Sequence, residues 1–376
     1  MSDTVSFEEL KCDNGDYIIA VATLDNPTSL NALTHNMLVL LNDQLAKWHE
    51  DDNVVCVLLD GAGEKAFCAG GDVRAMHDVM KHSPMEDAKA YCEAFFSVEY
   101  QCDYLIHTYC KPIIAWGEGI VMGGGMGLFM GASHKIVTPN SRLAMPEISI
   151  GLFPDVGATY FLNHLEQRLG LFLGLTGVML NASDAMDIHL ADHLVLNQEQ
   201  PSLLKQLQHA DWDSVEDSYE FVSECLTDLE QHVGDQKPQP QLADRLTDIY
   251  QACDADSVND VVGNILALPG NEKWLQMAKQ NLSQGSAVTA HICFRQIHNY
   301  AHLSLADVFR LELILALRSV LLGEFQEGVR SRLVDKDGNP NWRFQSVEQV
   351  DTAVIDEMFT SLWRDDEHPL ASLGHY

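Results

Sequence analysis

The sequence predicts an α/β fold that is extended by a helical C-terminal region. Short apolar runs rich in β-branched residues alternate with amphipathic helical patterns through the first half of the chain. After about Asn197 the strand patterns stop, and long amphipathic segments follow, among them a leucine-rich segment at residues 305–322 that is expected to be a helix. Alternating strands and helices indicate an α/β fold, and runs that are apolar on both faces are typical of a covered parallel sheet. We therefore predict an α/β core at residues 1–205 and a helical region at residues 206–376.

The first expected elements are a strand, a helix and a second strand. Residues 18–24 and residues 54–59 are short apolar runs, and each ends at an aspartate-containing turn. Between them a helix is expected after Thr34, whose hydroxyl can cap the first turn. Five apolar side chains share one face of this helix: Met37, Leu38, Leu41, Leu45 and Trp48. Further strands are expected at residues 113–116 and 136–137.

Two glycine-rich loops follow expected strands. Residues 65–72 include the pair Gly70-Gly71, and residues 117–131 include a triplet at 123–125. Glycine lets the backbone approach a ligand closely, and the free N–H groups that open a helix attract an anion. One such loop alone is more often a tight turn, whereas two in one α/β domain favour a ligand site. Neither loop has the spacing of a nucleotide-binding fingerprint.

Three carboxylates lie in apolar surroundings. Glu147 and Asp155 are eight residues apart, and each follows a proline in an otherwise apolar segment. Glu99 lies on the apolar face of a helix that is expected at residues 85–107. An apolar setting raises the pKa of a carboxylate toward values that are useful for acid–base chemistry. The alternatives are that Asp155 caps a helix or has a role in a turn, and that Glu99 reaches water or forms a buried salt bridge.

The composition excludes several classes of protein. The chain has 376 residues, and 55 acidic against 23 basic residues give a net charge of −32, which opposes binding to nucleic acid or to an anionic membrane. No apolar run is long enough to span a membrane. The histidines and the nine scattered cysteines show no metal-ligand spacing. The N-terminus is acidic where a targeting peptide would be basic, so we expect a cytoplasmic protein with reduced thiols.

The sequence resembles the crotonase (enoyl-CoA hydratase/isomerase) superfamily. The similar segments are residues 31–34, 66–72 and 123–125, which match its CoA-binding and oxyanion elements. Within the superfamily the chain is most similar to the 3-hydroxyisobutyryl-CoA hydrolase branch, through motifs in residues 145–162 and 325–337. The resemblance covers nearly the whole chain. It implies a crotonase-like (ClpP/crotonase) spiral of ββα units with an extended helical C-terminal region.

The resemblance also implies roles for individual residues. The backbone N–H groups of Gly71 and Gly124 would form an oxyanion hole for a thioester carbonyl. Glu147 would be the catalytic carboxylate, and Asp155 would be its partner near the substrate hydroxyl and the attacking water. Glu99 would line the acyl pocket and bind the substrate. Six residues would contact CoA: Asn31, Ala32, Leu33, Ala69, Gly70 and Asp72.

The implied reaction is hydrolysis of a short 3-hydroxyacyl-CoA thioester. The expected substrate is 3-hydroxyisobutyryl-CoA, which would yield 3-hydroxyisobutyrate and CoA in valine catabolism. No cofactor and no metal are expected, because CoA is part of the substrate. Hydratases of the superfamily carry a second Glu shortly after the glycine triplet, and this sequence has Gly127 there. The alternatives are a hydratase or isomerase for another acyl-CoA, and a non-catalytic protein that binds CoA esters.

The expected partner is therefore an acyl-CoA, which carries several phosphate charges. Lys65 and Lys111 lie beside the two loops and are candidates for binding those phosphates. The net charge of −32 predicts that such a ligand binds more tightly as salt screens the protein. The helical C-terminal region could build a dimer or replace the subunit contacts of trimeric relatives, so a homo-oligomer remains open.

Overall fold

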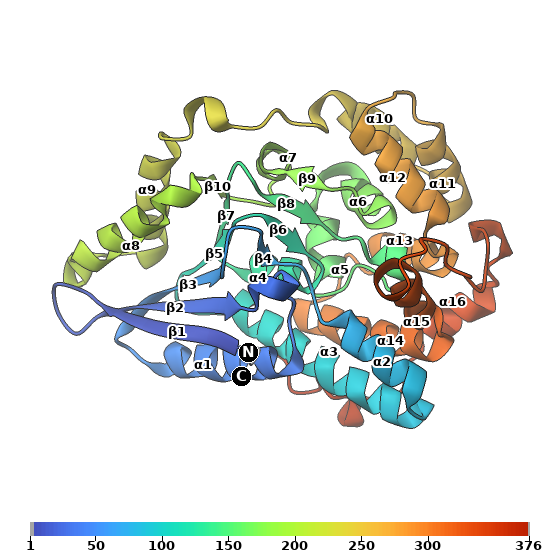
Figure 1. The fold of residues 1–376 in the computed structure, drawn as a ribbon, viewed down its shortest axis with the longest axis horizontal. Coiled ribbons are helices and arrows are strands. Elements are labelled where there is room, and N and C mark those ends of the chain that lie inside the picture. Colours follow the sequence, from blue (N-terminus) through green and yellow to red (C-terminus); the bar gives the residue numbers. More distant parts are fainter. Residues whose placement is uncertain (1–3, 375–376) are drawn as a thin grey trace. The chain divides into compact units, whose positions relative to one another are not determined.

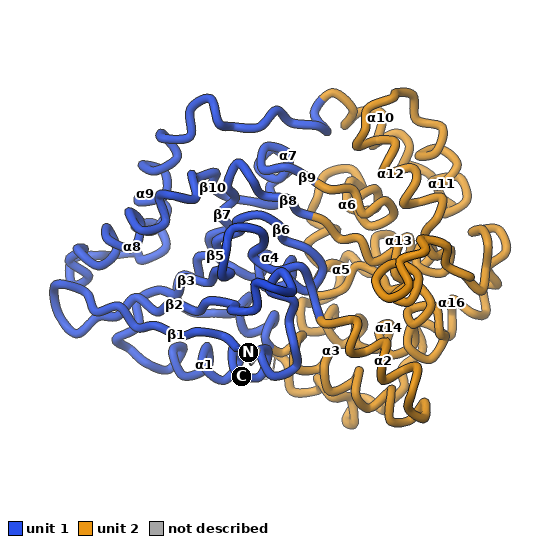
Figure 2. Tube along the Cα trace, in the orientation of Figure 1, with its two compact units in different colours: residues 1–71, 102–143, 180–243 blue, residues 72–101, 144–179, 244–376 orange. Residues whose placement is uncertain are grey.

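The structure is a computed structural model that describes residues 4–374 (Figure 1). The chain forms two compact units, and each unit collects three segments of the sequence (Figure 2). Unit 1 comprises the residues up to 71, residues 102–143 and residues 180–243. Unit 2 comprises residues 72–101, residues 144–179 and the residues from 244 onward. This grouping does not coincide with one boundary near residue 205, and the proposed division into a core and an extension stays a prediction.

The larger sheet of unit 1 has six strands in the order β1-β2-β3-β5-β7-β10. β1 is antiparallel to β2, and the other neighbouring pairs are parallel. The strands are β1 (Thr4–Lys11), β2 (Ile18–Asp25), β3 (Val54–Gly61), β5 (Ile113–Gly117), β7 (His134–Val137) and β10 (His193–Leu194). The four strands predicted from apolar runs are therefore confirmed. β1 was not predicted, because it is an edge strand with mostly exposed side chains and lacks an apolar run.

The main hydrophobic core of unit 1 joins this sheet to two helices that follow it, α8 (Gln200–His209) and α9 (Ser218–Glu230). Strand residues such as Ile19 and Ile114 pack in one cluster with Leu203 of α8 and Leu226 of α9. Within residues 4–374 no cysteine forms a disulfide, and Cys110 is exposed whereas the other eight are buried. Burial of both faces explains why these strands read as continuous apolar runs.

A second sheet has the order β4-β6-β8-β9. β4 and β6 are parallel, whereas β8 and β9 are antiparallel. Its strands are β4 (Ala66–Cys68), β6 (Ile120–Met122), β8 (Arg142–Ala144) and β9 (Leu180–Asn181). Each of the two glycine loops thus follows a strand of this sheet.

The other helices of unit 1 are α1 (His35–Glu50), α4 (Gly124–Gly131) and α7 (Ala182–Asp187). The Thr34 hydroxyl accepts a hydrogen bond from the Met37 N–H at 3.2 Å, which confirms the predicted cap of α1. All five residues of the predicted apolar face are buried. α3 (Met85–His107) has the predicted bounds, and its residues are divided between the two units at 101 and 102.

Unit 2 is mainly helical. Its helices, besides the first part of α3, are α2 (Val73–His82), α5 (Ala158–Phe161), α6 (Leu169–Thr176), α10 (Leu246–Cys253), α11 (Val258–Ala267), α12 (Lys273–Gln284), α13 (Ala287–Asn299), α14 (Leu305–Leu322), α15 (Glu324–Val329) and α16 (Thr352–Met358). A short 3-10 helix, η2 (Glu147–Ile150), begins at the expected catalytic glutamate. Within residues 4–374 no strand follows β10, as the sequence predicts. No helix in that range is long and apolar enough to cross a membrane.

Candidate active site

The two glycine loops lie against each other in unit 1. They follow β4 and β6, which are parallel neighbours, so both loops leave the same edge of the sheet. Gly70 has φ +101°, and a Cβ placed there would lie 3.3 Å from the Met122 carbonyl oxygen and 3.5 Å from the Gly124 nitrogen. A Cβ on Gly125 would lie 2.4 Å from the Cys68 carbonyl oxygen. Only residues without a side chain allow this close backbone approach.

Gly124 is the first residue of α4, and Gly123 precedes the helix as its N-cap. The first N–H groups of a helix have no partner within the helix, and they lie at the positive end of its dipole. The Gly70 contact places the loop that contains Gly71 next to this helix start. The structure thus brings together the two loops that carry the predicted oxyanion donors, while the roles of Gly71 and Gly124 stay predictions.

Five of the six predicted CoA-binding residues belong to two short segments that pair within unit 1. The Leu33 N–H donates to the Gly70 carbonyl at 2.8 Å, and the Ala69 N–H donates to the Leu30 carbonyl at 3.0 Å. Asn31, Leu33 and Gly70 are buried, whereas Ala32 and Ala69 are partly exposed. Their contacts with CoA stay predictions.

Two of the polar candidates in this region have structural hydrogen bonds. The Asn31 amide donates to the carbonyls of Ala62 and Ala66 at 3.0 and 2.8 Å. The ammonium of Lys111 donates to the carbonyls of Trp48 and Asp51 at 2.7 and 2.5 Å, at the C-terminal end of α1. Lys111 therefore satisfies the end of a helix, and it is a weaker phosphate candidate than the sequence suggests.

In unit 2, Asp72 is the N-cap of α2. Its carboxylate accepts a hydrogen bond from the Ala75 N–H at 3.1 Å. This local bond gives the side chain a structural role, and the predicted contact of Asp72 with CoA is untested. Lys65 of unit 1 is exposed and stays a candidate for the CoA phosphates.

The three predicted carboxylates are all buried in unit 2, with exposed fractions of 2% for Glu99, 4% for Glu147 and 3% for Asp155. One oxygen of Glu99 and one of Glu147 are buried without a hydrogen-bond partner. At least one oxygen of Glu99 therefore does not reach water, and within residues 4–374 Glu99 does not form the buried salt bridge that was its other alternative. Uncompensated buried polar atoms are costly, and they are typical of sites that receive a ligand.

Asp155 is bound by a tyrosine that sequence reasoning missed. The hydroxyl of Tyr100, which follows Glu99 in α3, donates to Asp155 Oδ2 at 2.7 Å. Asp155 does not cap a helix with its side chain, since α5 begins after Gly157 and has no side-chain cap. The capping alternative is thereby excluded, whereas the turn alternative agrees with the backbone, since the Asp155 carbonyl accepts from the Ala158 N–H at 2.9 Å. The sequence did not indicate a functional role for Tyr100, because a tyrosine on the apolar face of a helix is usually a core residue.

Burial raises the pKa of each of these carboxyl groups above its usual range. The pKa of Asp155 rises to about 7, and the hydrogen bond from Tyr100 limits that rise. The pKa values of Glu99 and Glu147 are raised by burial first and further by the charge of Asp155. Like charges in a buried cluster cannot all ionise at neutral pH, so the three groups share protons. Burial also raises the pKa of Tyr100, which keeps its hydroxyl a donor.

Glu312 is the second residue that sequence reasoning missed. It lies in α14, is fully buried, and accepts hydrogen bonds from the N–H groups of Gly157 and Thr159 at 2.7 and 2.9 Å. Burial raises its pKa to about 8, and the two N–H donors act in the opposite direction. A signal was present in the sequence, because Glu312 stands between leucines in the apolar helix 305–322.

Helix α13 and its N-cap Ser286 hold the segment that carries Glu147 and Asp155 through one backbone N–H and two side chains. Three backbone carbonyls of that segment are bonded in this way. The bonds are from the Ser286 N–H to Ile148 at 2.9 Å, from the Thr289 hydroxyl to Leu152 at 2.5 Å, and from the Gln296 amide to Pro154 at 2.9 Å. The Ser286 hydroxyl also donates to Glu324, another buried carboxylate.

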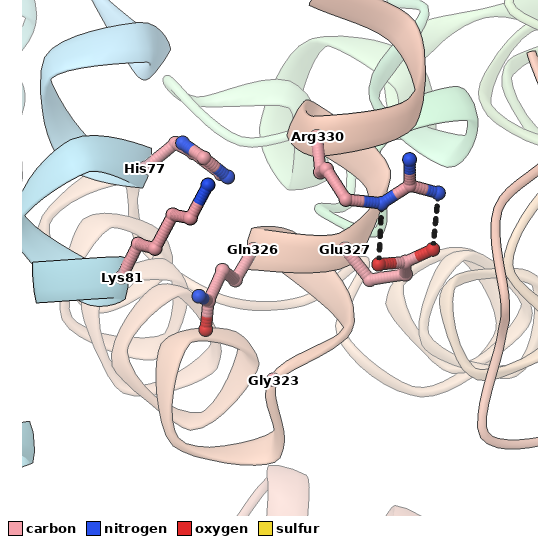
Figure 3. A pocket seen from close by; sticks show the side chains of 6 residues that line it. All are labelled: His77, Lys81, Gly323, Gln326, Glu327 and Arg330. Atoms are coloured by element: carbon pink, nitrogen blue, oxygen red, sulfur yellow. Dashed lines mark hydrogen bonds and ion pairs between the residues drawn. The ribbon is translucent and has the colours of Figure 1, made fainter. Parts of the chain in front are cut away.

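The motif at residues 325–330 supports the same segment. A Cβ on Gly328 would lie 2.2 Å from the Ile150 carbonyl carbon, so α15 packs directly on the end of η2. Arg330 forms ion pairs with Glu327 at 2.8 Å and with Asp335 and Asp337 at 2.7 Å each. A cavity of about 280 Å³ lies beside these groups (Figure 3), and its lining is His77, Lys81, Gly323, Gln326, Glu327 and Arg330. Because carboxylates already neutralise Arg330, its role here is to hold the loop that follows α15.

The chain belongs to the enoyl-CoA hydratase/isomerase family, since residues 19–359 match the family model with that description. Among curated proteins, the chain is 38% identical over 349 residues to the "3-hydroxyisobutyryl-CoA hydrolase, mitochondrial" of Danio rerio, covering 91% of this chain and 87% of the relative. It is also 38% identical over 352 residues to the protein of the same name from Xenopus tropicalis, covering 92% and 87%. The resemblance seen in the sequence is thereby confirmed.

Two solved structures share the fold over nearly the whole chain. One is an enoyl-CoA hydratase from Rhodobacter sphaeroides 2.4.1, with a TM-score of 0.80, 28% identity, and coverage of 96% of this chain and 98% of that one. The other is a carnitinyl-CoA dehydratase from Mycobacterium thermoresistibile, with a TM-score of 0.79, 31% identity, and coverage of 92% and 94%. The predicted crotonase-like fold with its helical C-terminal region is confirmed.

Proposed function

We propose that this chain is an acyl-CoA thioester hydrolase that converts 3-hydroxyisobutyryl-CoA to 3-hydroxyisobutyrate and CoA. One observation carries the proposal: relatives with that activity in their name match about nine-tenths of the chain at 38% identity. The proposed place of the reaction is valine catabolism, as the resemblance implies. The buried carboxylates and the paired glycine loops support the proposal, because thioester hydrolysis needs a base or nucleophile and an oxyanion site.

The proposed role of the glycine loops is to stabilise the oxyanion. Attack on a thioester carbonyl builds negative charge on its oxygen. In the proposed mechanism the N–H groups of Gly71 and Gly124 bind that oxygen, and donors fixed by the fold need no reorganisation during the reaction. Removing one such donor typically lowers the rate by about 10²–10³.

The proposed role of Glu147 is to deliver the attack. In one route its ionised carboxylate removes a proton from water, whose oxygen bonds to the carbonyl carbon while the C–S bond breaks. In the other route Glu147 itself bonds to the carbonyl carbon, and water then hydrolyses the anhydride. Both routes need the ionised form, and the raised pKa of Glu147 makes that form a strong base. The proton leaves with the CoA thiol.

Asp155 and Glu99 are proposed to bind the distal part of the substrate. Asp155, oriented by Tyr100, would contact the attacking water and the 3-hydroxyl group. Glu99 has a buried oxygen without a partner, which suits it to accept a hydrogen bond from that hydroxyl. No other cofactor enters the proposed reaction, and residues 4–374 hold no group of three or more side chains suited to a metal ion.

A second candidate function is hydration of an enoyl-CoA. The enoyl-CoA hydratase from Rhodobacter sphaeroides favours it, because that protein shares the fold over nearly the whole chain. Against it stands Gly127, which is buried in α4 at the position where hydratases carry their second glutamate. Without that side chain, addition of water by two glutamates lacks one of its acid–base groups.

The experiment that separates the two candidates compares two substrates with the purified protein. A thiol reagent measures CoA release, and absorbance measures loss of the double bond. Hydrolysis predicts rapid thiol release from 3-hydroxyisobutyryl-CoA and little change of crotonyl-CoA. Consumption of crotonyl-CoA without thiol release would instead assign hydration.

The location and assembly of the protein remain predictions. The names of the curated relatives contain the word mitochondrial, so they do not support the cytoplasmic location expected from the sequence. An acyl-CoA ligand is consistent with the family. A homo-oligomer and the absence of nucleic-acid and membrane partners are untested expectations.

A further inference from the structure

The turn that carries Asp155 has a strained backbone. Val156 has φ +54° and Gly157 has φ +88°, so two consecutive residues lie in the left-handed region. Glycine adopts this conformation freely, whereas a β-branched residue there is a genuine outlier. Such strain persists only where the surrounding structure over-determines it, and it is concentrated at functional sites.

Glu312 supplies the contacts that hold this turn. Its two carboxylate oxygens accept one N–H each, Oε2 from Gly157 and Oε1 from Thr159. Gly157 follows Val156 directly, and Thr159 lies two residues further along the chain. The side chain suits this geometry because each of its two oxygens accepts one N–H, and both bonds favour the ionised form against the rise in pKa that burial causes. Glutamine at this position could offer only one acceptor oxygen.

The same turn places the Asp155 carboxylate within hydrogen-bond distance of the Tyr100 hydroxyl. The groups that face Asp155 come from three elements: Glu99 and Tyr100 from α3, Glu147 from η2, and Glu312 from α14. None of the four is a lysine, arginine or histidine. Asp155 is therefore oriented by the hydrogen bond from Tyr100 and by the backbone turn, and it forms no ion pair with a basic side chain of residues 4–374.

We propose that Glu312 is a positioning residue for the proposed hydrolysis. By binding the N–H groups of Gly157 and Thr159, it fixes the left-handed turn that presents the Asp155 carboxylate to Tyr100. Helix α14, which belongs to the helical C-terminal region, then positions Asp155 in the proposed active site. This inference deepens the proposed function and rests on it.

The central test is a double-mutant cycle between Glu312→Gln and Val156→Gly. Misplacing a catalytic group by about 1 Å can lower a rate by about 100-fold. We therefore expect Glu312→Gln to lower kcat by about 10–100-fold and to change KM by less than about 3-fold. Val156→Gly removes the strain, so the double variant should recover about tenfold of that loss. Additive effects of the two substitutions would contradict the proposal.

The matched control is Asp184→Asn in unit 1. Asp184 is a buried carboxylate whose Oδ1 accepts two backbone N–H groups, from Gln241 at 2.6 Å and from Leu242 at 3.0 Å, while its Oδ2 accepts the Asn181 N–H and the Gln241 amide. We expect this control to lose thermal stability comparably to Glu312→Gln and to keep the kcat of the folded enzyme. An equal loss of kcat in both variants would show a general effect of stability and would overturn the proposal.

Amide hydrogen exchange tests the turn without reference to activity. In Glu312→Gln we expect exchange at residues 156–160 to accelerate by at least about tenfold, while residues 241–242 keep the wild-type rate. Unchanged exchange at residues 156–160 would overturn the positioning role even if kcat falls. If the wild-type protein does not release thiol from 3-hydroxyisobutyryl-CoA, the proposed function fails, and exchange still decides whether Glu312 holds the turn.

Discussion

The glycine loops of unit 1 and the carboxylates of unit 2 differ in the groups that they offer and in how the fold holds those groups. In unit 1 the proposed oxyanion donors are backbone N–H groups, and their position follows from glycines that allow close approach of two loops. In unit 2 the useful groups are buried side chains, which the fold must hold against the free-energy penalty of burying charge. The arrangement of the glycine loops therefore follows from residues within the loops themselves. The arrangement of the carboxylates depends on helices far along the chain. Substitutions should affect the two regions in correspondingly different ways.

The largest expected effect is in unit 2. Glu147→Gln keeps the shape of the side chain and removes its ability to act as base or nucleophile. We expect kcat to fall by at least about 10³-fold while the CoA ester still binds, as general-base and nucleophilic roles require. Steady-state kinetics and calorimetric titration with substrate would measure both quantities. Full activity of this variant would remove Glu147 from the mechanism.

The next effect is in unit 1. Gly125→Ala should lower kcat by about 10²-fold or more, because its Cβ would meet the Cys68 carbonyl oxygen at 2.4 Å and displace the start of α4. The matched control is Gly263→Ala in α11, where a Cβ meets nothing within 4 Å. That substitution should raise helix stability by about 0.5–1 kcal/mol and leave kcat unchanged. Equal kcat values for the two variants would contradict the role assigned to the glycine loops.

A smaller effect is expected from Tyr100→Phe. Burial raises the pKa of Asp155 to about 7, although the hydrogen bond from the Tyr100 hydroxyl lowers it. Removing that hydroxyl therefore raises the pKa of Asp155 further, so the acidic limb of the kcat/KM profile should move to higher pH. Activity at pH 7 should fall several-fold and recover near pH 9, since one pKa unit corresponds to about tenfold in the ionised fraction. A profile that drops uniformly at every pH would show that Tyr100 does not act through Asp155.

Glu99→Gln should change both selectivity and stability. The pKa of Glu99 is raised by burial, so the folded state holds a proton that the unfolded state releases at neutral pH. Stability then decreases as pH rises through and above the pKa of the unfolded group. The variant removes this contribution, and its free energy of unfolding should depend less on pH between 5 and 8 than that of the wild type. Its preference for 3-hydroxyacyl-CoA over plain acyl-CoA should also decrease, and an unchanged preference would exclude contact with the hydroxyl.

The smallest effect concerns the whole molecule. Because the net charge is −32 and CoA is polyanionic, raising the salt concentration should lower KM for the CoA ester. The change should be no more than a few-fold, because the N–H donors proposed for the ester act at short range, where salt screens little. A KM that rises with salt would indicate a cationic CoA site that outweighs the net charge.

The features that the sequence predicted are those with local causes. The strands at residues 18–24 and 54–59 were visible because parallel strands buried on both faces are continuous apolar runs. α14 was visible from its leucine pattern, and its bounds agree with the prediction. The three buried carboxylates were visible because charged residues are rare in apolar segments.

The residues that escaped prediction act through partners distant in the sequence. The role of Tyr100 depends on its hydrogen bond to Asp155. The role of Glu312 depends on its hydrogen bond from Gly157, which is 155 residues away in the chain. A hydrophobic pattern along the sequence cannot reveal such a pair, because only the fold brings the two segments together. β1 escaped for another reason, since an exposed edge strand has no apolar run to reveal it.

Product analysis in H₂¹⁸O tests the central claim most directly. The purified protein is incubated with 3-hydroxyisobutyryl-CoA, and mass spectrometry follows the acid and the CoA species. Hydrolysis predicts free CoA and an equal amount of 3-hydroxyisobutyrate that carries ¹⁸O in its carboxyl group over many turnovers, with neither product formed by Glu147→Gln. A CoA ester that stays intact, or that loses water to give an unsaturated ester, would contradict the proposed hydrolysis.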